Sequence, residues 1–574
     1  MTGTTAPSSA AILDAEIPMR DGTVLRANVY LPSPLPTGGV PALLTRTAYG
    51  KDSPMSGAYP PLATRGYAVI MEDKRGRYAS DGEYTLLRDD ADGVHKDGFD
   101  TVEWIADQPW SNGEVAVFGL SYLGATAIGA AISQPPHLKA GIVLQPSTDE
   151  YTDRTFTDGV LFLQNVIDWA ALPFVAPSII EKLPAAEQAA VQAELEEFLA
   201  LGDARYSILP LIDTPYFRRL EMVWGGPLAH RENEAYFADN RVGGAEAAAV
   251  RVPLLHVGSW FDFFTRNSVR QFELVSGLSR AGADQRLVMG PWAHASLAVG
   301  SVAGVEFPGS AIDENAMVAA WADRWLGDAP SGAADWPRAI IYVLGANRWR
   351  AEPAWPIPGT QTRSLALRVD GSASFDPDEE RGVRTFRDDP AAPYGASPAV
   401  AGPRDVAVDL GGDNVAFYTT ERCSEPYEIT GWPRAVLHAS TTGTDADWLV
   451  ELHVVGADHS SRLVNEGITR SRYRHGRTAP RAVEPGVVEE LAVHLRPISI
   501  VIQPGERLRV VVAGGKFPAY ERNPGAFVDL NTATEADFVV SERTIVSGPG
   551  LSRIELPIVP AGAGGEWIDN PWPA

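Results

Sequence analysis

The sequence contains a single cysteine, Cys423, among its 574 residues. One thiol cannot form an intramolecular disulfide, which excludes a disulfide-stabilised secreted scaffold. The N-terminal residues also lack the cationic and apolar regions of a secretion signal, so the sequence predicts a cytoplasmic protein. Motifs of the types Cys-x-x-Cys and His-Glu-x-x-His and the phosphate-binding loop are absent, so neither a metal ion nor a cofactor is expected.

Long apolar runs and an excess of positive charge are absent as well. No stretch approaches the roughly 20 consecutive apolar residues of a membrane span. Lys and Arg number 48 against 73 Asp and Glu, which gives a formal charge of -25. Because affinity for polyanions comes mostly from Lys and Arg, we expect no nucleic-acid partner and no membrane binding. The expected partner is a small molecule.

The first part of the chain alternates strand and helix patterns. Residues 17–32 predict an N-terminal hairpin, and short apolar runs at 41–44, 67–71, 115–118 and 140–144 predict buried strands. Between two of these runs, Phe99, Val102 and Ile105 have helical spacing. This alternation is typical of an α/β protein with a largely parallel sheet.

The strand pattern stops between residues 149 and 250, where the Ala- and Glu-rich segment 185–201 favours a helix. It resumes with runs at 252–257 and 287–289 and with helical patterns at 265–278 and 316–326. Past residue 349, short alternating segments separated by Gly, Asp and Pro predict an all-β sandwich or jelly roll. We therefore predict a discontinuous α/β domain (1–148 and 251–348), an inserted helical cap (149–250) and a C-terminal β domain (349–574).

The strongest local motif surrounds Ser121 in Val-Phe-Gly-Leu-Ser-Tyr-Leu-Gly, where an apolar strand runs into a tight turn and then a small-residue helix. A serine on such a turn is held clear of the sheet beside the N–H groups of a helix N-terminus, so this context predicts a nucleophile elbow. The spelling departs from the usual pattern, because Gly124 follows the serine by three residues rather than two. On the motif alone, a glycine-rich turn with an idle serine is an equal alternative.

Two further polar residues follow the ends of later strands. Asp262 comes just past the run 252–257, and His294 follows the run 287–289. Active sites of open α/β sheets gather at the carboxyl ends of strands, and the order Ser121, Asp262, His294 is that of an α/β-hydrolase triad. A serine hydroxyl needs an imidazole to accept its proton, and the imidazolium then needs a fixed carboxylate. Each residue alone is more often a loop or turn residue, but type, placement and order agree for all three.

The segments around these residues resemble the cocaine esterase type of serine hydrolase, which is grouped with the Xaa-Pro dipeptidyl-peptidases and the α-amino acid ester hydrolases. The matching segments are Gly-Leu-Ser121-Tyr-Leu-Gly, Gly-Ser-Trp-Phe-Asp262-Phe-Phe, Gly-Pro-Trp-Ala-His294-Ala-Ser, Arg46-Thr-Ala-Tyr49-Gly-Lys51 and Phe517-Pro-Ala-Tyr-Glu-Arg-Asn523. The resemblance covers nearly the whole chain. It implies an α/β-hydrolase domain with an inserted helical cap and a C-terminal all-β jelly-roll domain, in agreement with the boundaries predicted from pattern.

The resemblance also implies an oxyanion hole. One donor is the backbone N–H of Tyr122, which the elbow geometry predicts as well, and the other, by similarity, is the hydroxyl of Tyr49. Aromatic side chains of the cap and beside Asp262 could line a hydrophobic acyl pocket, although most of them could equally form the cap's own core. These candidates are Tyr151, Trp169, Phe174, Phe263 and Phe264.

We therefore predict a metal-independent serine carboxylesterase that cleaves a small ester, aromatic and amide-bearing esters included, through an acyl-serine. Leu123 stands where, by the resemblance, amino acid ester hydrolases carry Glu, which favours a neutral ester. The alternatives with the same triad are an amidase, an α-amino acid ester hydrolase, an Xaa-Pro dipeptidyl-peptidase, and acyl transfer to a nucleophile other than water. A binding module with an inert hydrolase domain is a further alternative. The sequence leaves the oligomeric state open, with a homodimer among the alternatives.

Overall fold

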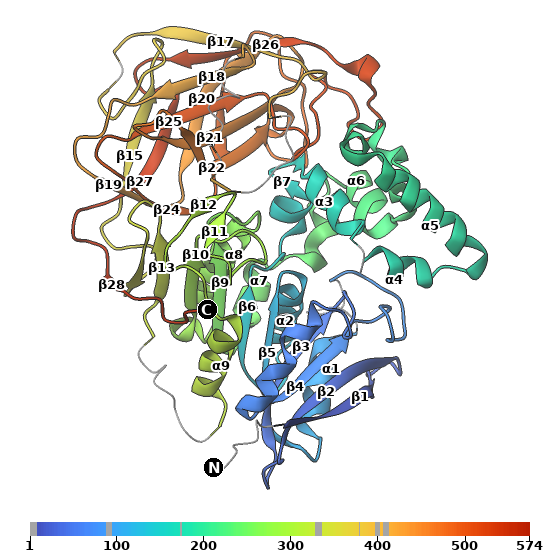
Figure 1. The fold of residues 1–574 in the computed structure, drawn as a ribbon. Helices are drawn as coiled ribbons and strands as arrows, with labels where there is room; N and C mark the ends of the chain where they lie inside the picture. Colours follow the sequence, from blue (N-terminus) through green and yellow to red (C-terminus); the bar gives the residue numbers. More distant parts are fainter. Residues whose placement is uncertain are drawn as a thin grey trace.

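The computed structural model describes residues 8–87, 95–172, 175–327, 336–377, 379–395, 402–403, 405 and 412–574. Within this part of the chain, a sheet of 11 strands runs in the order β1-β2-β4-β3-β5-β6-β9-β10-β13-β14-β28 (Figure 1). The first strands are β1 (Ser8–Pro18), β2 (Val24–Ser33), β3 (Val40–Thr47), β4 (Ala68–Asp73), β5 (Ser111–Leu120) and β6 (Leu138–Leu144). The remaining ones are β9 (Leu254–Ser259), β10 (Arg286–Gly290), β13 (Ala339–Val343), β14 (Arg348–Glu352) and β28 (Glu566–Ile568).

The middle of this sheet is parallel and its two margins are antiparallel. Neighbouring strands from β4 to β13 in the sheet order pair in parallel. The predicted N-terminal hairpin is formed by β1 and β2, which pair antiparallel at one margin. Every residue of β4 and of β9 is buried, because strands of a parallel sheet are covered on both faces. The predicted α/β class is confirmed.

Helices cover this sheet at the places that the sequence pattern indicates. They are α1 (Asp97–Ala106), α2 (Tyr122–Ser133), α8 (Thr265–Leu278) and α9 (Glu314–Trp325). All 12 residues of α2 are buried, since its small side chains let it lie close against the sheet. No helix in the described ranges is long and apolar enough to cross a membrane.

Between β6 and β9 the chain leaves the sheet and forms mostly short helices, most of which lie to the right in Figure 1. Its named elements include β7 (Phe156–Thr157), β8 (Val160–Leu161), α3 (Leu163–Ala170), α4 (Ala176–Glu181), α5 (Ala185–Ala200), α6 (Gly226–Ala229) and α7 (Gly244–Ala249). The last helix, α7, differs from the others. Its Ala247 packs in the same core as Val275 of α8 and Leu254 of β9, so the segment before the predicted boundary at residue 250 already belongs to the α/β core.

The C-terminal part forms two antiparallel sheets, at the top of Figure 1. One contains β16 (Ala373–Ser374), β15 (Gln361–Leu367), β27 (Arg553–Val559), β20 (Arg434–Thr441), β26 (Ser541–Ser547) and β17 (Gly382–Asp388), with β19 (Tyr427–Gly431), β23 (Glu489–His494) and β24 (Ile498–Ile502) attached. The other is β18 (Val415–Thr419), β25 (Arg507–Ala513), β21 (Asp447–Val455) and β22 (Ser461–Arg470). The predicted all-β domain is confirmed.

The end of the chain returns to the first sheet. Strand β28 pairs with β14, which in turn pairs with β13, so the boundary predicted at residues 348 and 349 falls inside β14. The ring of Trp567 lies 5.2 Å from the guanidinium carbon of Arg348 and 5.1 Å from that of Arg350. These partners are more than 200 residues apart in the sequence, and no local pattern indicates such a pairing.

Candidate active site

Ser121 occupies the turn between β5 and α2, as the elbow motif predicts. Its backbone has φ 62° and ψ -119°, a conformation that costs energy for a residue with a side chain and that the surrounding structure must hold. The Ser121 N–H donates to the carbonyl of Leu144 at 2.8 Å. This bond ties the turn to the carboxyl end of the neighbouring strand β6.

Two glycines permit this turn. A Cβ added to Gly119 would lie 2.4 Å from the carbonyl carbon of Leu123, and one added to Gly124 would lie 2.8 Å from the carbonyl oxygen of Leu144. Both distances are too short for a side chain. The close approach of helix and strand therefore requires a glycine three residues after Ser121, which accounts for the unusual spelling of the motif.

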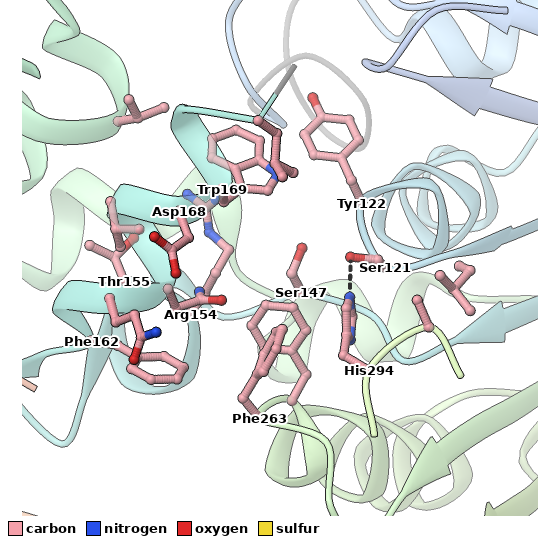
Figure 2. A pocket seen from close by; sticks show the side chains of 18 of the residues that line it. Ser121, Tyr122, Ser147, Arg154, Thr155, Phe162, Asp168, Trp169, Phe263 and His294 are labelled. Carbon is pink, nitrogen blue, oxygen red and sulfur yellow. Dashed lines mark hydrogen bonds between the residues drawn. The ribbon is translucent and has the colours of Figure 1, made fainter. Parts of the chain in front are cut away.

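Asp262 and His294 follow adjacent parallel strands. Gly290 at the end of β10 lies opposite Ser259 at the end of β9, so the two loops leave the sheet at the same edge. Nδ1 of His294 lies 2.9 Å from Oδ1 of Asp262. Nε2 of His294 lies 2.8 Å from Oγ of Ser121, the contact drawn as a dashed line in Figure 2. The donor in each contact depends on the imidazole tautomer: with the proton on Nδ1, that nitrogen donates to the carboxylate and Nε2 can accept from the serine hydroxyl.

Asp262 and His294 differ in their contact with solvent. The side chain of Asp262 is fully buried and that of His294 is 19% exposed. Oδ2 of Asp262 is also buried and has no hydrogen-bond partner within the described residues. The rings of Phe263 and Phe264 lie 4.4 and 5.3 Å from the imidazole, and they keep water away from one side of it.

Tyr49 lies just past β3, on the same edge of the sheet. Its oxygen accepts a hydrogen bond from Nε1 of Trp169 at 2.9 Å, and its ring packs edge-on against Tyr122 at 5.9 Å. The ordinary pKa of a tyrosine, about 10, already keeps the phenol protonated at neutral pH, and burial raises the pKa of Tyr49 further. A protonated phenol can donate a hydrogen bond as well as accept one.

Tyr122 is the first residue of α2, directly after Ser121. Its backbone N–H belongs to the first turn of the helix, where N–H groups have no partner inside the helix. Its side chain points away from the serine in Figure 2, and the Tyr122 hydroxyl donates to the carbonyl of Leu86 at 2.5 Å. The side chain thus anchors the elbow to the segment that contains Leu86.

A cavity of about 380 Å³ opens beside Ser121 and His294, a size that accommodates a small organic ligand. Tyr49, Trp169, Phe263 and Phe264 are among the predicted residues that line it. Further apolar side chains in its wall are Met55, Leu120, Phe162, Val166, Leu172 and Val223. The cap supplies one side through α3, and the α/β domain supplies the other (Figure 2).

The structure does not bring Tyr151 to this cavity. Its ring is held instead by the guanidinium of Arg477, 3.8 Å above it, and by Phe237, whose ring centre lies 5.4 Å away. The Tyr151 ring, which the sequence suggested as part of the acyl pocket, therefore packs against Arg477 of the β domain instead. Phe174, the other cap candidate, lies outside the described residues.

Two charged residues that sequence reasoning missed also line the cavity. Arg154 pairs with Oε1 of the buried Glu150 at 2.6 Å. Asp168 pairs with Arg205 at 3.0 Å and accepts from the hydroxyl of Tyr206 at 2.6 Å. The predicted cap is rich in charged residues that face solvent. The sequence contains nothing that distinguishes Arg154 and Asp168 from these solvent-exposed residues.

Comparison with known proteins agrees with this geometry. Residues 21–296 match the X-Pro dipeptidyl-peptidase (S15 family) model, and residues 331–545 match that of the X-Pro dipeptidyl-peptidase C-terminal non-catalytic domain. The chain is 31% identical to the cocaine esterase of Rhodococcus sp. (strain MB1 Bresler) over 95% of this chain and 97% of that protein. The chain belongs to the family of serine hydrolases that includes the X-Pro dipeptidyl-peptidases and this cocaine esterase.

Solved structures show the same architecture as this S15-family chain. An α-amino acid ester hydrolase superposes with a TM-score of 0.81 at 24% identity, covering 97% of this chain and 98% of that one. An aminopeptidase from a marine sediment archaeon, Thaumarchaeota archaeon, superposes with a TM-score of 0.79 at 24% identity, covering 97% of each chain. Both solved structures therefore share the overall fold of this chain.

Proposed function

We propose that this family member is a serine carboxylesterase in which Ser121 is the nucleophile, His294 the general base and acid, and Asp262 the residue that orients the imidazole. The observation that carries the proposal is the chain of two hydrogen bonds from Asp262 through His294 to Ser121, 2.9 and 2.8 Å long. This chain ends at the floor of a largely apolar cavity.

In the acylation step, Oγ of Ser121 attacks the ester carbonyl as Nε2 of His294 takes its proton. The imidazolium that forms is stabilised by the buried carboxylate of Asp262. His294 then returns the proton to the departing alcohol, which leaves an acyl-serine. A water molecule activated by the same imidazole releases the carboxylic acid and restores the free serine.

The negative charge of each tetrahedral intermediate develops on the former carbonyl oxygen. In this proposal, the hydroxyl of Tyr49 and the backbone N–H of Tyr122 donate to that oxygen. Donors fixed in place before the reaction stabilise the transition state more than the substrate, because the full charge exists only there. The position of Tyr49 supports this role, since its side chain lines the same cavity as Ser121 and His294.

The cavity favours a small, neutral ester with an apolar acyl or aryl group. Recognition of an α-amino group needs a carboxylate that is free to bind it. Asp168 is the one acidic side chain among the described residues that line the cavity, and its carboxylate is already held by Arg205 and Tyr206. The similarity to a cocaine esterase, whose name denotes an ester substrate, points in the same direction.

Hydrolysis of p-nitrophenyl acetate, butyrate and octanoate by the wild type and by Ser121→Ala tests the proposal. We expect activity on at least the shorter esters and its loss in the variant. A wild type that is inactive on all three but is labelled covalently by a fluorophosphonate would reassign the substrate to amides or amino esters. Failure of both assays would overturn the proposal, and added amines or alcohols in the same assay would reveal acyl transfer.

A further inference from the structure

Gln145 is buried at the same edge of the sheet as the triad, and the mechanism above does not use it. It directly follows β6 and its residue exposure is 0%. Its backbone has φ 41°, in the left-handed region that a residue with a side chain adopts only when its surroundings hold it there. The backbone N–H of Gln145 donates to the carbonyl of Val257 in β9 at 2.7 Å.

The amide group of Gln145 bonds to the peptide groups on both sides of His294. Its Nε2 donates to the carbonyl of Ala293 at 3.1 Å, and its Oε1 accepts from the backbone N–H of Ala295 at 2.7 Å. The same Nε2 donates to Oγ of Ser259, at the end of β9, at 2.5 Å. One side chain thus links the loop that carries His294 to the strand that leads to Asp262.

We propose that Gln145 is a positioning residue that fixes the imidazole of His294 between Asp262 and Ser121. The inference rests on the proposed function, because it assumes that His294 serves Ser121 in catalysis. Ala295 has φ 56°, so the loop is itself in a conformation that needs support. Proton transfer depends on hydrogen-bond distance, and a displacement of about 1 Å can cost about 10²-fold in rate.

The chemistry of the side chain is specific to this task. A carbonyl and an N–H on one loop require a donor and an acceptor on the same group, which an amide supplies and a carboxylate does not. Glutamate would keep the bond from Ala295 but place a second acceptor against the carbonyl of Ala293. Methionine has a similar volume and forms neither bond.

Gln285 provides a matched control. It is also fully buried, and its amide likewise bonds backbone groups: Oε1 accepts from the N–H of Leu254 at 3.1 Å, and Nε2 donates to the carbonyls of Val252 and Ala281 at 3.0 Å. The contacts with Val252 and Leu254 lie at the start of β9, a strand of six residues, and Oε1 also lies 3.0 Å from Nε2 of His256 in this strand. At about 3.3 Å per residue, the five steps from Leu254 to Ser259 place the start of this strand about 16 Å from the edge that carries the triad.

The experiment compares the wild type, Gln145→Met, Gln145→Glu and Gln285→Met. For each protein, kcat and KM for p-nitrophenyl butyrate, the rate constant for labelling by a fluorophosphonate, and Tm are measured. We expect Gln145→Met to lower kcat and the labelling rate constant about 10²-fold with little change in KM, and Gln145→Glu to recover part of this loss. Gln285→Met should lower Tm but leave kcat and labelling within about two-fold, since its contacts are remote from His294.

The inference is overturned if Gln145→Met keeps kcat within about three-fold of the wild type, or if Gln285→Met loses as much activity as Gln145→Met. If Gln145→Met does not fold, the inference is tested with Gln145→Glu, which keeps the shape of the side chain and the hydrogen bond from Ala295. A loss of kcat without a change in KM in Gln145→Glu supports the inference, and an unchanged kcat overturns it. A wild type that neither hydrolyses esters nor is labelled would overturn the proposed function instead, and this inference with it.

Discussion

The indole N–H of Trp169 donates to the phenol oxygen of Tyr49 at 2.9 Å, which joins the cap directly to the predicted oxyanion hole. Tyr49 lies beyond β3 of the sheet, whereas Trp169 belongs to α3 of the cap. A hydroxyl that accepts one hydrogen bond becomes a better donor through its own hydrogen. The contact also fixes the phenol, so a cap residue that lines the cavity has a second role in orienting Tyr49.

We expect Tyr49→Phe to lower kcat by about 10² to 10³ with a smaller effect on KM, because one donor to the developing oxyanion is lost and the substrate wall is kept. Steady-state kinetics with p-nitrophenyl butyrate measure both constants. The buried ring remains in place, so Tm should change little. A kcat equal to that of the wild type would remove Tyr49 from the mechanism.

Trp169→Phe should lower kcat by a smaller factor, about 3- to 10-fold, through loss of the N–H that polarises and orients Tyr49. The decisive measurement is a double-mutant cycle, in which Trp169→Phe is also made in the Tyr49→Phe background. If Trp169 acts through Tyr49, its substitution has almost no further effect on kcat there. Equal losses in both backgrounds would show that Trp169 acts only as a wall of the cavity.

Asp262→Asn should lower kcat by about 10⁴ while the protein stays folded. The amide nitrogen of asparagine would donate to Nδ1 of His294, which places the imidazole proton on Nε2. In that tautomer, the imidazole cannot accept the proton of Ser121. Steady-state kinetics measure the loss and circular dichroism checks the fold; activity within ten-fold of the wild type would show that this carboxylate does not set the tautomer.

Gly124→Ala and Gly277→Ala should change stability in opposite directions, although both glycines lie in helices that cover the sheet. A Cβ on Gly124 would meet the carbonyl oxygens of Leu144 and Gly119 at 2.8 and 2.9 Å, whereas one on Gly277 meets nothing within 4 Å. We expect Gly124→Ala to lose about 1–3 kcal/mol and to lower kcat by shifting the elbow. Gly277→Ala should gain up to about 1 kcal/mol with unchanged kcat. Urea unfolding measures both, and a neutral Gly124→Ala would show that the elbow does not need glycine there.

The sequence predicts the α/β-hydrolase architecture well because its signals are local. The buried strands are apolar runs, α8 begins and ends where the helical spacing does, and Ser121 lies on a motif whose glycines the turn requires. Asp262 and His294 are found by their placement after neighbouring strands, since parallel strands end at one edge. The structure brings these three side chains into hydrogen-bonding distance of one another.

The features that the sequence does not predict depend on contacts between segments that are far apart in the chain. Tyr151 is aromatic and lies in the cap, yet Arg477 from the β domain occupies its face. Gln145 is a single polar residue after a strand, and only the folded chain shows that it bonds to the loop of His294. Strand β28 joins the first sheet by pairing with β14, far from it in the chain. None of these partners can be read from a local pattern.

Glu521 offers a test of how the cap is held on the β domain. This residue lies in the β domain, and its carboxylate accepts hydrogen bonds from Arg231 of the cap at 3.1 and 3.0 Å. It also accepts hydrogen bonds from Arg470 of β22 at 2.7 Å and from the backbone N–H of Leu161 at 3.1 Å. All three charged side chains are almost completely buried. Burial alone would raise the pKa of Glu521, but the charges of Arg231 and Arg470 outweigh it and lower the pKa to about 2.

The sign of the pH effect follows from this shift. In the unfolded chain the carboxyl titrates near its ordinary value of 4.5, so the stabilisation by ionised Glu521 is fully present above that pH. It is lost progressively as the pH falls from about 4.5 towards 2, because the unfolded state then takes up a proton that the folded state does not. Glu521→Gln should cost about 3–5 kcal/mol at pH 7, since two buried guanidinium groups lose a charged partner.

The measurement is the free energy of unfolding in urea for wild type and Glu521→Gln at pH 7, 5, 4 and 3. We expect the difference between the two proteins to be constant down to about pH 5 and to narrow below it. Glu194→Gln is the control, because Glu194 pairs with the half-exposed Arg218 and Arg219 on the surface of the cap and its loss should cost no more than about 1 kcal/mol. A Glu521→Gln difference that is as small as that of the control, or that does not change with pH, would show that this buried cluster is not what holds the cap in place.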